Sequence, residues 1–206
     1  MNIKRYIATI ILAIVLLLNF SCTDWLDVKP VDRMSEDQLY STEAGFRQAL
    51  NGIYVELNHA DLYGDELLVN TVEILAQRYK FSSMGTLTNQ YHLAEFDYTT
   101  DYAKKCGSRI WEKAYALIAN VNKLLKNADS HKDLFTGDSY DLITGEAYAL
   151  RAFLHFDLLR LFGPVYKTHK EDKSICYNTQ FSLSGSDLLP ASKVMEYVIA
   201  DLKEAE

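Results

Sequence analysis

The stretch Gly145–Tyr166 reads GEAYALRAFLHFDLLRLFGPVY. Its apolar residues recur every three or four positions, which is the spacing of one helical face. Gly163 tolerates a positive φ and Pro164 cannot continue a helix, so we expect the helix to end there. The other sides are also mostly apolar, which predicts a helix packed between other helices in a bundle or solenoid. The first apolar face consists of Ala147, Leu150, Leu154, Leu158 and Leu161.

The same stretch closely resembles the hallmark segment of the SusD/RagB family, whose long helix carries G-E-A-x-x-L-R-A-x-x-x-F-x-L-x-x-x-F-G-x-V. Members of this family are outer-membrane lipoproteins of Bacteroidetes that help to capture glycans or peptides. Tyr166 stands where a proline usually follows the valine. The matching residues are Gly145, Glu146, Ala147, Leu150, Arg151, Ala152, Phe156, Leu158, Phe162, Gly163 and Val165.

Two further segments resemble the same family, so the resemblance covers essentially the whole chain. One is W-x3-Y-x-x-I-x3-N, which is also a loose match to a tetratricopeptide (TPR) helix. The other begins at Pro190, with Ala191 where an arginine is usual. The resemblance implies an all-α fold, a TPR-like helical repeat scaffold that forms the N-terminal portion of a SusD-like protein. The matching residues are Trp111, Tyr115, Ile118 and Asn122, and then Pro190, Ser192, Glu196, Asp201 and Leu202.

The N-terminus has the features of an export signal. Lys4 and Arg5 precede an apolar run over 7–18, which is too short to span a bilayer of about 30 Å as a helix. A small residue before Cys22 resembles a lipoprotein signal, with Cys22 acylated as the first mature residue. The alternative is an ordinary signal peptide in which Cys22 is an incidental thiol. The acidic start of the mature chain resembles signals that send such lipoproteins to the cell surface.

Composition limits the class of function. The net charge is −7 over 206 residues, and no basic stripe is present, so we expect no nucleic-acid partner. The 14 tyrosines suit contact with sugars or peptides, although core packing explains most of them. Acid–base catalysis needs two carboxylates, or a histidine and a carboxylate, that converge in a cleft. The carboxylates of this sequence are scattered, so we predict no catalytic residues.

Cysteine and histidine spacing indicates neither a disulfide framework nor a metal site. Cys106 and Cys176 are 70 residues apart and belong to no C-x-x-C pair. We favour two free thiols, with a disulfide as the alternative in an exported protein. The five histidines form no H-x-x-x-H or H-E-x-x-H motif, so we expect no metal ligands and no cofactor.

Hydrophobic periodicity predicts five helices. They cover 43–58, 66–79, 103–127, 140–162 and 193–206. The expected N-caps are Thr42, Asp65 and Ser192. In the second helix the expected inward residues are Leu68, Val72, Leu75 and Ala76, and in the last they are Val194, Val198 and Leu202.

The segment 76–101 is the candidate ligand-binding region. It combines amides, a guanidinium and aromatic rings, and carbohydrate sites commonly join aromatic stacking to polar hydrogen bonds. Long loops are often functional, and we expect residues 80–100 to form one. An ordinary surface loop is the alternative. The predicted ligand-binding residues are Arg78, Asn89, Tyr91 and Asp97.

The domain organisation follows from these features. We expect a lipoprotein signal peptide over 1–21, an acylated tether over 22–38 and a helical domain over 39–206. The resemblance implies a protein anchored by lipid at the outer-membrane surface, which hands an oligosaccharide or peptide ligand to a TonB-dependent, SusC-like transporter. The alternatives are a scaffold that only docks to the transporter, or a fragment without function. Helix signals run to Glu206 and the family's chains are longer, so we expect a truncated N-terminal portion.

Overall fold

The computed structural model describes residues 34–81, 85, 87–181 and 186–206. Met1–Ser35 is one unit, of which Met34 and Ser35 belong to the described part, and Glu36–Glu206 is a second. Everything below concerns the second unit. Cys22, the expected site of acylation, lies outside the described residues.

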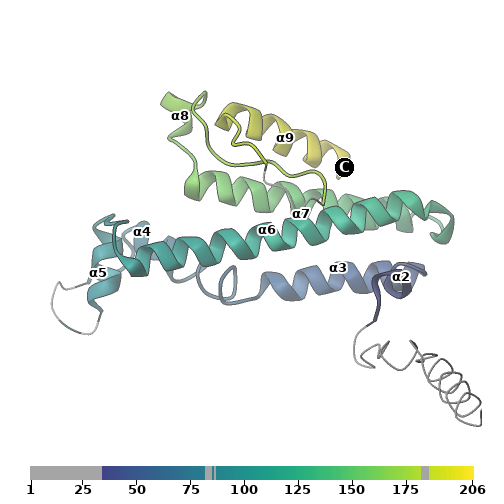
Figure 1. Cartoon of the computed structure of the whole chain (residues 1–206), viewed down its shortest axis with the longest axis horizontal. Coiled ribbons are helices and arrows are strands. Elements are labelled where there is room, and N and C mark those ends of the chain that lie inside the picture. The colour runs from purple at the N-terminus through teal and green to yellow at the C-terminus, as the bar shows by residue number, and fades with distance from the viewer. Residues whose placement is uncertain (1–33, 82–84, 86, 182–185) are drawn as a thin grey trace, which may run out of the picture. The chain divides into compact units, whose positions relative to one another are not determined.

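The described part of the second unit is helical (Figure 1). Within it, the only β-pairing is an isolated bridge between Lys173 and Pro190. The helices are α2 Glu36–Leu39, α3 Glu43–Leu57, α4 Thr71–Leu75, α5 Thr88–Ala94, α6 Asp101–Ser130, η2 Lys132–Leu134, α7 Ser139–Phe162, α8 Tyr166–His169 and α9 Ala191–Glu204.

The long helices α6 and α7 are the centre of the unit. Residues 131–138 join them, and they run antiparallel in Figure 1. Helix α3 packs on both of them, and α9 packs on α7. Thr42 and Thr100 cap α3 and α6, because each hydroxyl oxygen accepts a hydrogen bond from a backbone N–H three residues on, at 3.1 and 3.2 Å.

The apolar faces predicted from periodicity form the core between these helices. Helix α7 is buried on most of its sides, as expected for a helix enclosed by neighbours. The side chains of this core that are nearly inaccessible to solvent include Phe46, Ile110, Leu117, Ile118, Leu124, Ile143, Leu154 and Leu158.

The expected helix over 66–79 is wrong. The chain forms a series of turns to Asn70, and only α4 is helical. The residues after Asp65 form turns, and its Oδ2 accepts a bond from Nδ2 of Asn70 at 3.3 Å, so Asp65 does not cap a helix. Buried Glu66 accepts a bond from Thr71 and pairs with Arg109 of α6, which holds these turns against the core.

Several finer expectations also differ from the structure. Leu68 is 58% exposed, Ala76 is exposed and Leu202 of α9 is 50% exposed. The region 80–100 contains α5 and is not a continuous loop. Pro190, and not Ser192, occupies the N-cap of α9, while the hydroxyl of Ser192 donates to Glu171.

Two glycines of the hallmark stretch are explained by close approaches of the backbone. Gly163 ends α7 with a φ of −84°, so the expected positive φ is wrong. A Cβ at Gly163 would lie 2.4 Å from the carbonyl oxygen of Leu159, which excludes any side chain. A Cβ at Gly145 would lie 3.1 Å from the carbonyl oxygen of Ala205, where the end of α9 meets α7.

The segment expected as a tether overlaps the compact unit at its end. Residues 36–38 belong to α2, which contacts α3, and Lys123 of α6 donates to Glu36 at 2.8 Å. Among the described helices, none is long and apolar enough to cross a membrane. Cys106 and Cys176 are both free, as favoured from their spacing.

Candidate functional site

A buried polar network joins α6, α7, α9 and the segment 174–181. At its centre, Nε and Nη2 of Arg151 donate to the two carboxylate oxygens of Asp201 at 2.6 and 2.7 Å. Both side chains are less than a tenth exposed. Nη1 of Arg151 donates to Oδ1 of Asn122 at 2.9 Å, and the Tyr177 hydroxyl donates to Asp201 at 2.6 Å. Burial alone would lower the pKa of Arg151, but its bonds to Asp201 outweigh this and raise it.

Three of these residues come from separate motifs of the sequence. Arg151 belongs to the hallmark stretch, Asn122 to the second motif and Asp201 to the third. In the sequence, each of these three residues appeared only as a matching position in a family motif. The structure shows that they meet in one hydrogen-bonded cluster that locks α9 onto α7.

His155 extends the network to the segment 174–181. The backbone N–H of Asn178 donates to its Nε2 at 3.0 Å, so Nδ1 carries the proton and donates to the Arg151 carbonyl at 2.8 Å. Its ring also stacks on Tyr177, with centroids 3.8 Å apart. Burial, with a smaller contribution from the charge of Arg151, lowers the pKa of His155 to about 4, so it is neutral at pH 7.

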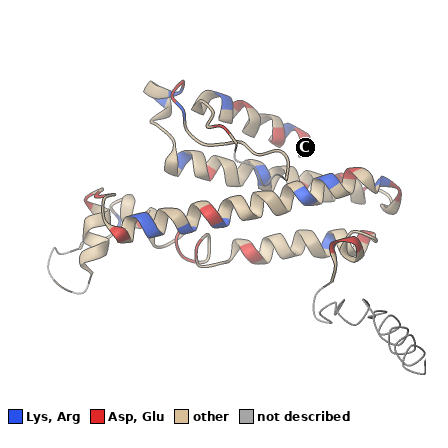
Figure 2. Ribbon diagram, viewed as in Figure 1, with Lys and Arg blue, Asp and Glu red and all other residues tan. Residues whose placement is uncertain are grey.

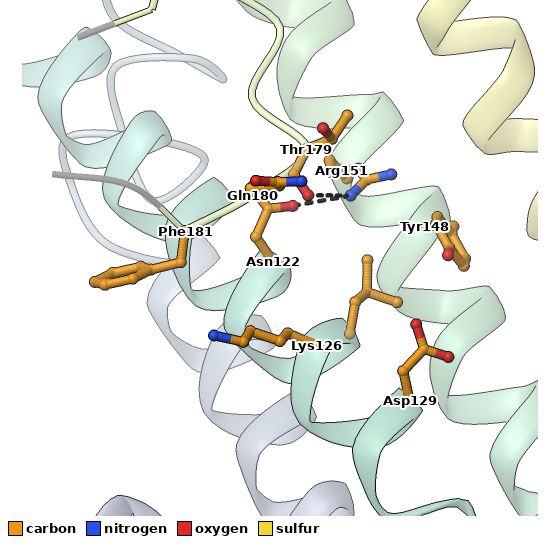
Figure 3. Close-up of a pocket in the computed structure, with 9 residues that line it drawn as sticks. Asn122, Lys126, Asp129, Tyr148, Arg151, Thr179, Gln180 and Phe181 are labelled. Carbon is orange, nitrogen blue, oxygen red and sulfur yellow. Dashed lines mark hydrogen bonds between the residues drawn. The ribbon is translucent and has the colours of Figure 1, made fainter. Parts of the chain in front are cut away.

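A hollow of about 500 Å³ opens above this network. Figure 3 shows Arg151 hydrogen-bonded to Asn122 and Thr179, with Lys126 and Phe181 to one side and Tyr148 to the other. We name it the α6–α7 hollow. The residues lining it are Asn122, Leu125, Lys126, Asp129, Tyr148, Arg151, Thr179, Gln180 and Phe181.

The polar side chains at the floor of the α6–α7 hollow are already hydrogen-bonded within the network. Arg151 and both polar atoms of Asn122 are engaged within the network. Within the described residues, the Lys126 ammonium, the Gln180 amide and the Tyr148 hydroxyl make no hydrogen bond. The Thr179 hydroxyl and Oδ2 of Asp129 also line the hollow, and no described residue bonds to either atom. The hollow therefore offers these polar groups around an occupied floor. Sequence analysis did not select any of the residues that line the hollow as ligand contacts. Two of them, Gln180 and Phe181, lie in a segment without periodicity.

The predicted ligand-binding residues lie on the part formed by α4, α5 and the turns next to them. Arg78 follows α4 and is exposed, Asn89 is exposed on α5, and Tyr91 is half-buried on α5. Asp97 has a local role before α6, because Oδ1 accepts bonds from the backbone and hydroxyl of Thr99 at 3.0 and 2.6 Å. These bonds lower the pKa of Asp97.

These four residues share one region but no hollow that the structure describes. Oδ2 of Asp97 lies 3.6 Å from Nδ1 of His92, which places it beside α5. The amide of Gln77 donates to the Ala94 carbonyl at 2.6 Å and thereby joins the turn after α4 to α5. No described cluster of three or more His, Cys, Asp or Glu side chains is arranged to hold a metal ion.

Charge is dispersed over this unit. Figure 2 shows blue and red residues alternating along the described helices, without a basic stripe on any of them. Many charged groups form pairs on the surface, such as Lys113 with Glu56 and Arg160 with Asp157.

Comparison with known proteins identifies the family. A family model described as "Starch-binding associating with outer membrane", SusD-like, matches residues 24–205. The chain belongs to the SusD-like family. SusD-like protein P2 of Formosa agariphila is 27% identical over 98% of this chain, and SusD-like protein P25 of the same organism is 27% identical over 70%. The chain spans 38% and 28% of the length of these two relatives.

Solved structures share the SusD-like fold. A SusD superfamily protein from Bacteroides fragilis matches with a TM-score of 0.66 at 18% identity, over 80% of this chain and 39% of that one. A SusD-like carbohydrate binding protein from Bacteroides vulgatus matches with a TM-score of 0.65 at 22% identity, over 80% and 35%. The expected all-α, TPR-like helical scaffold is thereby confirmed.

Proposed function

We propose that this chain belongs to an outer-membrane lipoprotein that binds a glycan and delivers it to a TonB-dependent, SusC-like transporter. The observation that carries the proposal is the match of residues 24–205 to a family described as starch-binding and associated with the outer membrane. The helical scaffold has the fold of solved SusD-like proteins, and one of these is described as carbohydrate binding. We propose binding without catalysis, and a peptide ligand is the alternative.

The proposed ligand contacts are Arg78, Asn89, Tyr91 and Asp97. Three of them present exposed or half-buried polar or aromatic groups on or beside α5, whereas the Asp97 carboxylate is partly occupied by Thr99. Calorimetric titration of the purified chain with maltohexaose and other hexasaccharides tests binding. Replacing Arg78 or Tyr91 with Ala should weaken it. A scaffold that only docks to the transporter should bind none of the sugars.

The proposed anchor is Cys22, preceded by a signal peptide over 1–21 and followed by a tether that ends before α2 begins at Glu36. Acyl chains bind membranes because each buried CH₂ contributes about 0.8 kcal/mol. In cells, Cys22→Ala should move the protein to the soluble fraction and abolish labelling by a palmitate analogue. Protease treatment of intact cells tests surface display. A Cys22→Ala protein that still pellets with membranes and takes up the label contradicts the anchor.

A further inference from the structure

One face of α7 carries an exposed aromatic ring between charged residues. Glu146, Phe153, Asp157 and Arg160 follow one another at steps of seven, four and three, which keeps them on a single helical face. This face extends about 21 Å, since each helical residue rises about 1.5 Å. Phe153 is 44% exposed on a helix that is otherwise buried on most sides.

Two tyrosines from other elements complete this surface. Tyr63 stacks on Phe153 with centroids 5.1 Å apart and planes 24° apart, and its hydroxyl donates to Oδ2 of Asp157 at 2.8 Å. Tyr54 of α3, which is 40% exposed, donates its hydroxyl to Glu146 at 2.8 Å. We name this surface the aromatic shelf; it consists of Tyr54, Tyr63, Glu146, Phe153, Asp157 and Arg160.

The hydrogen bonds of the aromatic shelf fix its polar groups in place. Nη1 of Arg160 donates to Oδ1 of Asp157 at 2.9 Å. Burial and the neighbouring carboxylates raise the pKa of both tyrosines, that of Tyr54 to about 12, so both hydroxyls stay protonated at neutral pH. Each carboxylate oxygen keeps a lone pair, and Arg160 keeps N–H groups that no described residue uses.

The aromatic shelf ends in a second hollow, of about 400 Å³. Asp157 and Arg160 form its polar rim, and Leu75 and Leu161 are among its apolar residues. Tyr98, which is 57% exposed, also lines it. This hollow therefore borders the 76–101 segment that sequence analysis selected, through Ala76 and Tyr98, neither of which was among the four predicted residues.

The alternation of rings and charged groups matches the chemistry of a sugar chain. A pyranose has an apolar face of C–H groups, which stacks on an aromatic ring, and a rim of hydroxyls, which pair with carboxylates and guanidinium groups. The length of the shelf suits several sugar units in a row. Its two carboxylates and one guanidinium leave one net negative charge, which disfavours acidic sugars.

We propose that the aromatic shelf binds a neutral oligosaccharide, with Phe153 stacking against a sugar ring and Asp157 and Arg160 bonding its hydroxyls. This inference rests on the proposed function and adds a site and a ligand class to it. It places sugar contacts on α7 itself, beside the 76–101 segment and apart from the α6–α7 hollow.

Calorimetric titration of the full chain tests the aromatic shelf. The neutral probes are maltohexaose, cellohexaose and xylohexaose, and the acidic probe is hexagalacturonate. We expect a neutral probe to bind and the acidic one to bind at least about tenfold more weakly. Phe153→Ala should weaken binding of that neutral probe about tenfold, as for the loss of one aromatic stack. Asp157→Asn should also weaken it.

Two controls separate the site from general effects. Phe181→Ala removes a ring of similar exposure, 47%, from the α6–α7 hollow, and should change the affinity less than about twofold. Phe153→Leu keeps apolar volume without a ring and should behave like Phe153→Ala. Each variant should still melt in one cooperative transition, because none of the substituted side chains is fully buried, although Phe153→Ala and Asp157→Asn lose contacts with Tyr63.

Each other outcome overturns a defined part. If a neutral probe binds as tightly to Phe153→Ala and to Asp157→Asn as to the wild type, the aromatic shelf is overturned and the proposed function is not. Loss of binding in Phe181→Ala alone moves the site to the α6–α7 hollow. Tighter binding of hexagalacturonate overturns the ligand class. A wild-type chain that binds none of the four probes overturns both the shelf and the proposed function.

Discussion

Replacing Asp201 with Asn tests the buried network most directly. The change preserves the size of the side chain but leaves the charge of Arg151 without its counter-ion. Removing one partner of a buried pair costs about 3–5 kcal/mol. Solvent screens this pair poorly, since the two side chains are 7% and 9% exposed. Asn122 and the Thr179 carbonyl still accept bonds from Arg151, so we expect the lower end, about 3 kcal/mol.

Urea denaturation followed by circular dichroism measures this loss in the free energy of unfolding. The melting temperature should also fall by roughly 6–12 °C, because a chain of this size loses about 2–4 °C per kcal/mol of stability. Glu196→Gln, in the exposed pair with Lys193, is the matched control and should leave the midpoint unchanged. A loss below about 1 kcal/mol for Asp201→Asn would refute the reasoning, since that is the range of exposed pairs.

Three further substitutions test the core, the histidine and the contact between helices. Leu154→Ala should cost about 2–5 kcal/mol in a urea titration because it leaves a cavity, whereas Leu142→Ala, at a side chain 59% exposed, should cost far less. The pKa of His155 is about 4 in the folded state, whereas its ordinary value is 6.5. As the pH falls, His155 is therefore protonated in the unfolded chain before it is protonated in the folded chain. Stability should therefore be complete above pH 6.5 and decline towards pH 4 by up to about 3 kcal/mol, and His155→Gln should flatten this decline; equal slopes would contradict it. Gly145→Leu should lower the melting temperature more than Gly52→Leu, because a side chain at 145 meets the Ala205 carbonyl and one at 52 meets open space; equal melting would count against the close approach.

Much of the helical architecture was predictable from local patterns. The apolar faces of α3, α6, α7 and α9 repeat over many residues, so tertiary packing and local preference agree. The region 58–81 was not predictable in this way. There, the Glu66 carboxylate pairs with Arg109, which is 43 residues away, and local turns replace the expected helix.

The sites were harder to predict for a related reason. Three residues of the buried network were visible in the motifs, whereas Tyr177 and His155 were not. Arg151 lies 29 and 50 residues from Asn122 and Asp201, and no local pattern indicates that they meet. The aromatic shelf was missed because Phe153 and Asp157 lie inside a helix that periodicity assigns to the core. The ligand-binding role of the 76–101 segment stays a prediction.

The position of Asp201 near the end of the described chain has a consequence for the order of folding. Helices α6 and α7 are joined by a short connection, so the contacts next to it, such as the bond of Tyr140 to Asp129, close small loops and can form early. The bonds of Arg151 to α9 close a much longer loop, and they are expected to be absent from the transition state. Mutations at Asp201 should then accelerate unfolding while leaving the folding rate nearly unchanged. The network would thus determine the unfolding rate, and with it the lifetime of the native state.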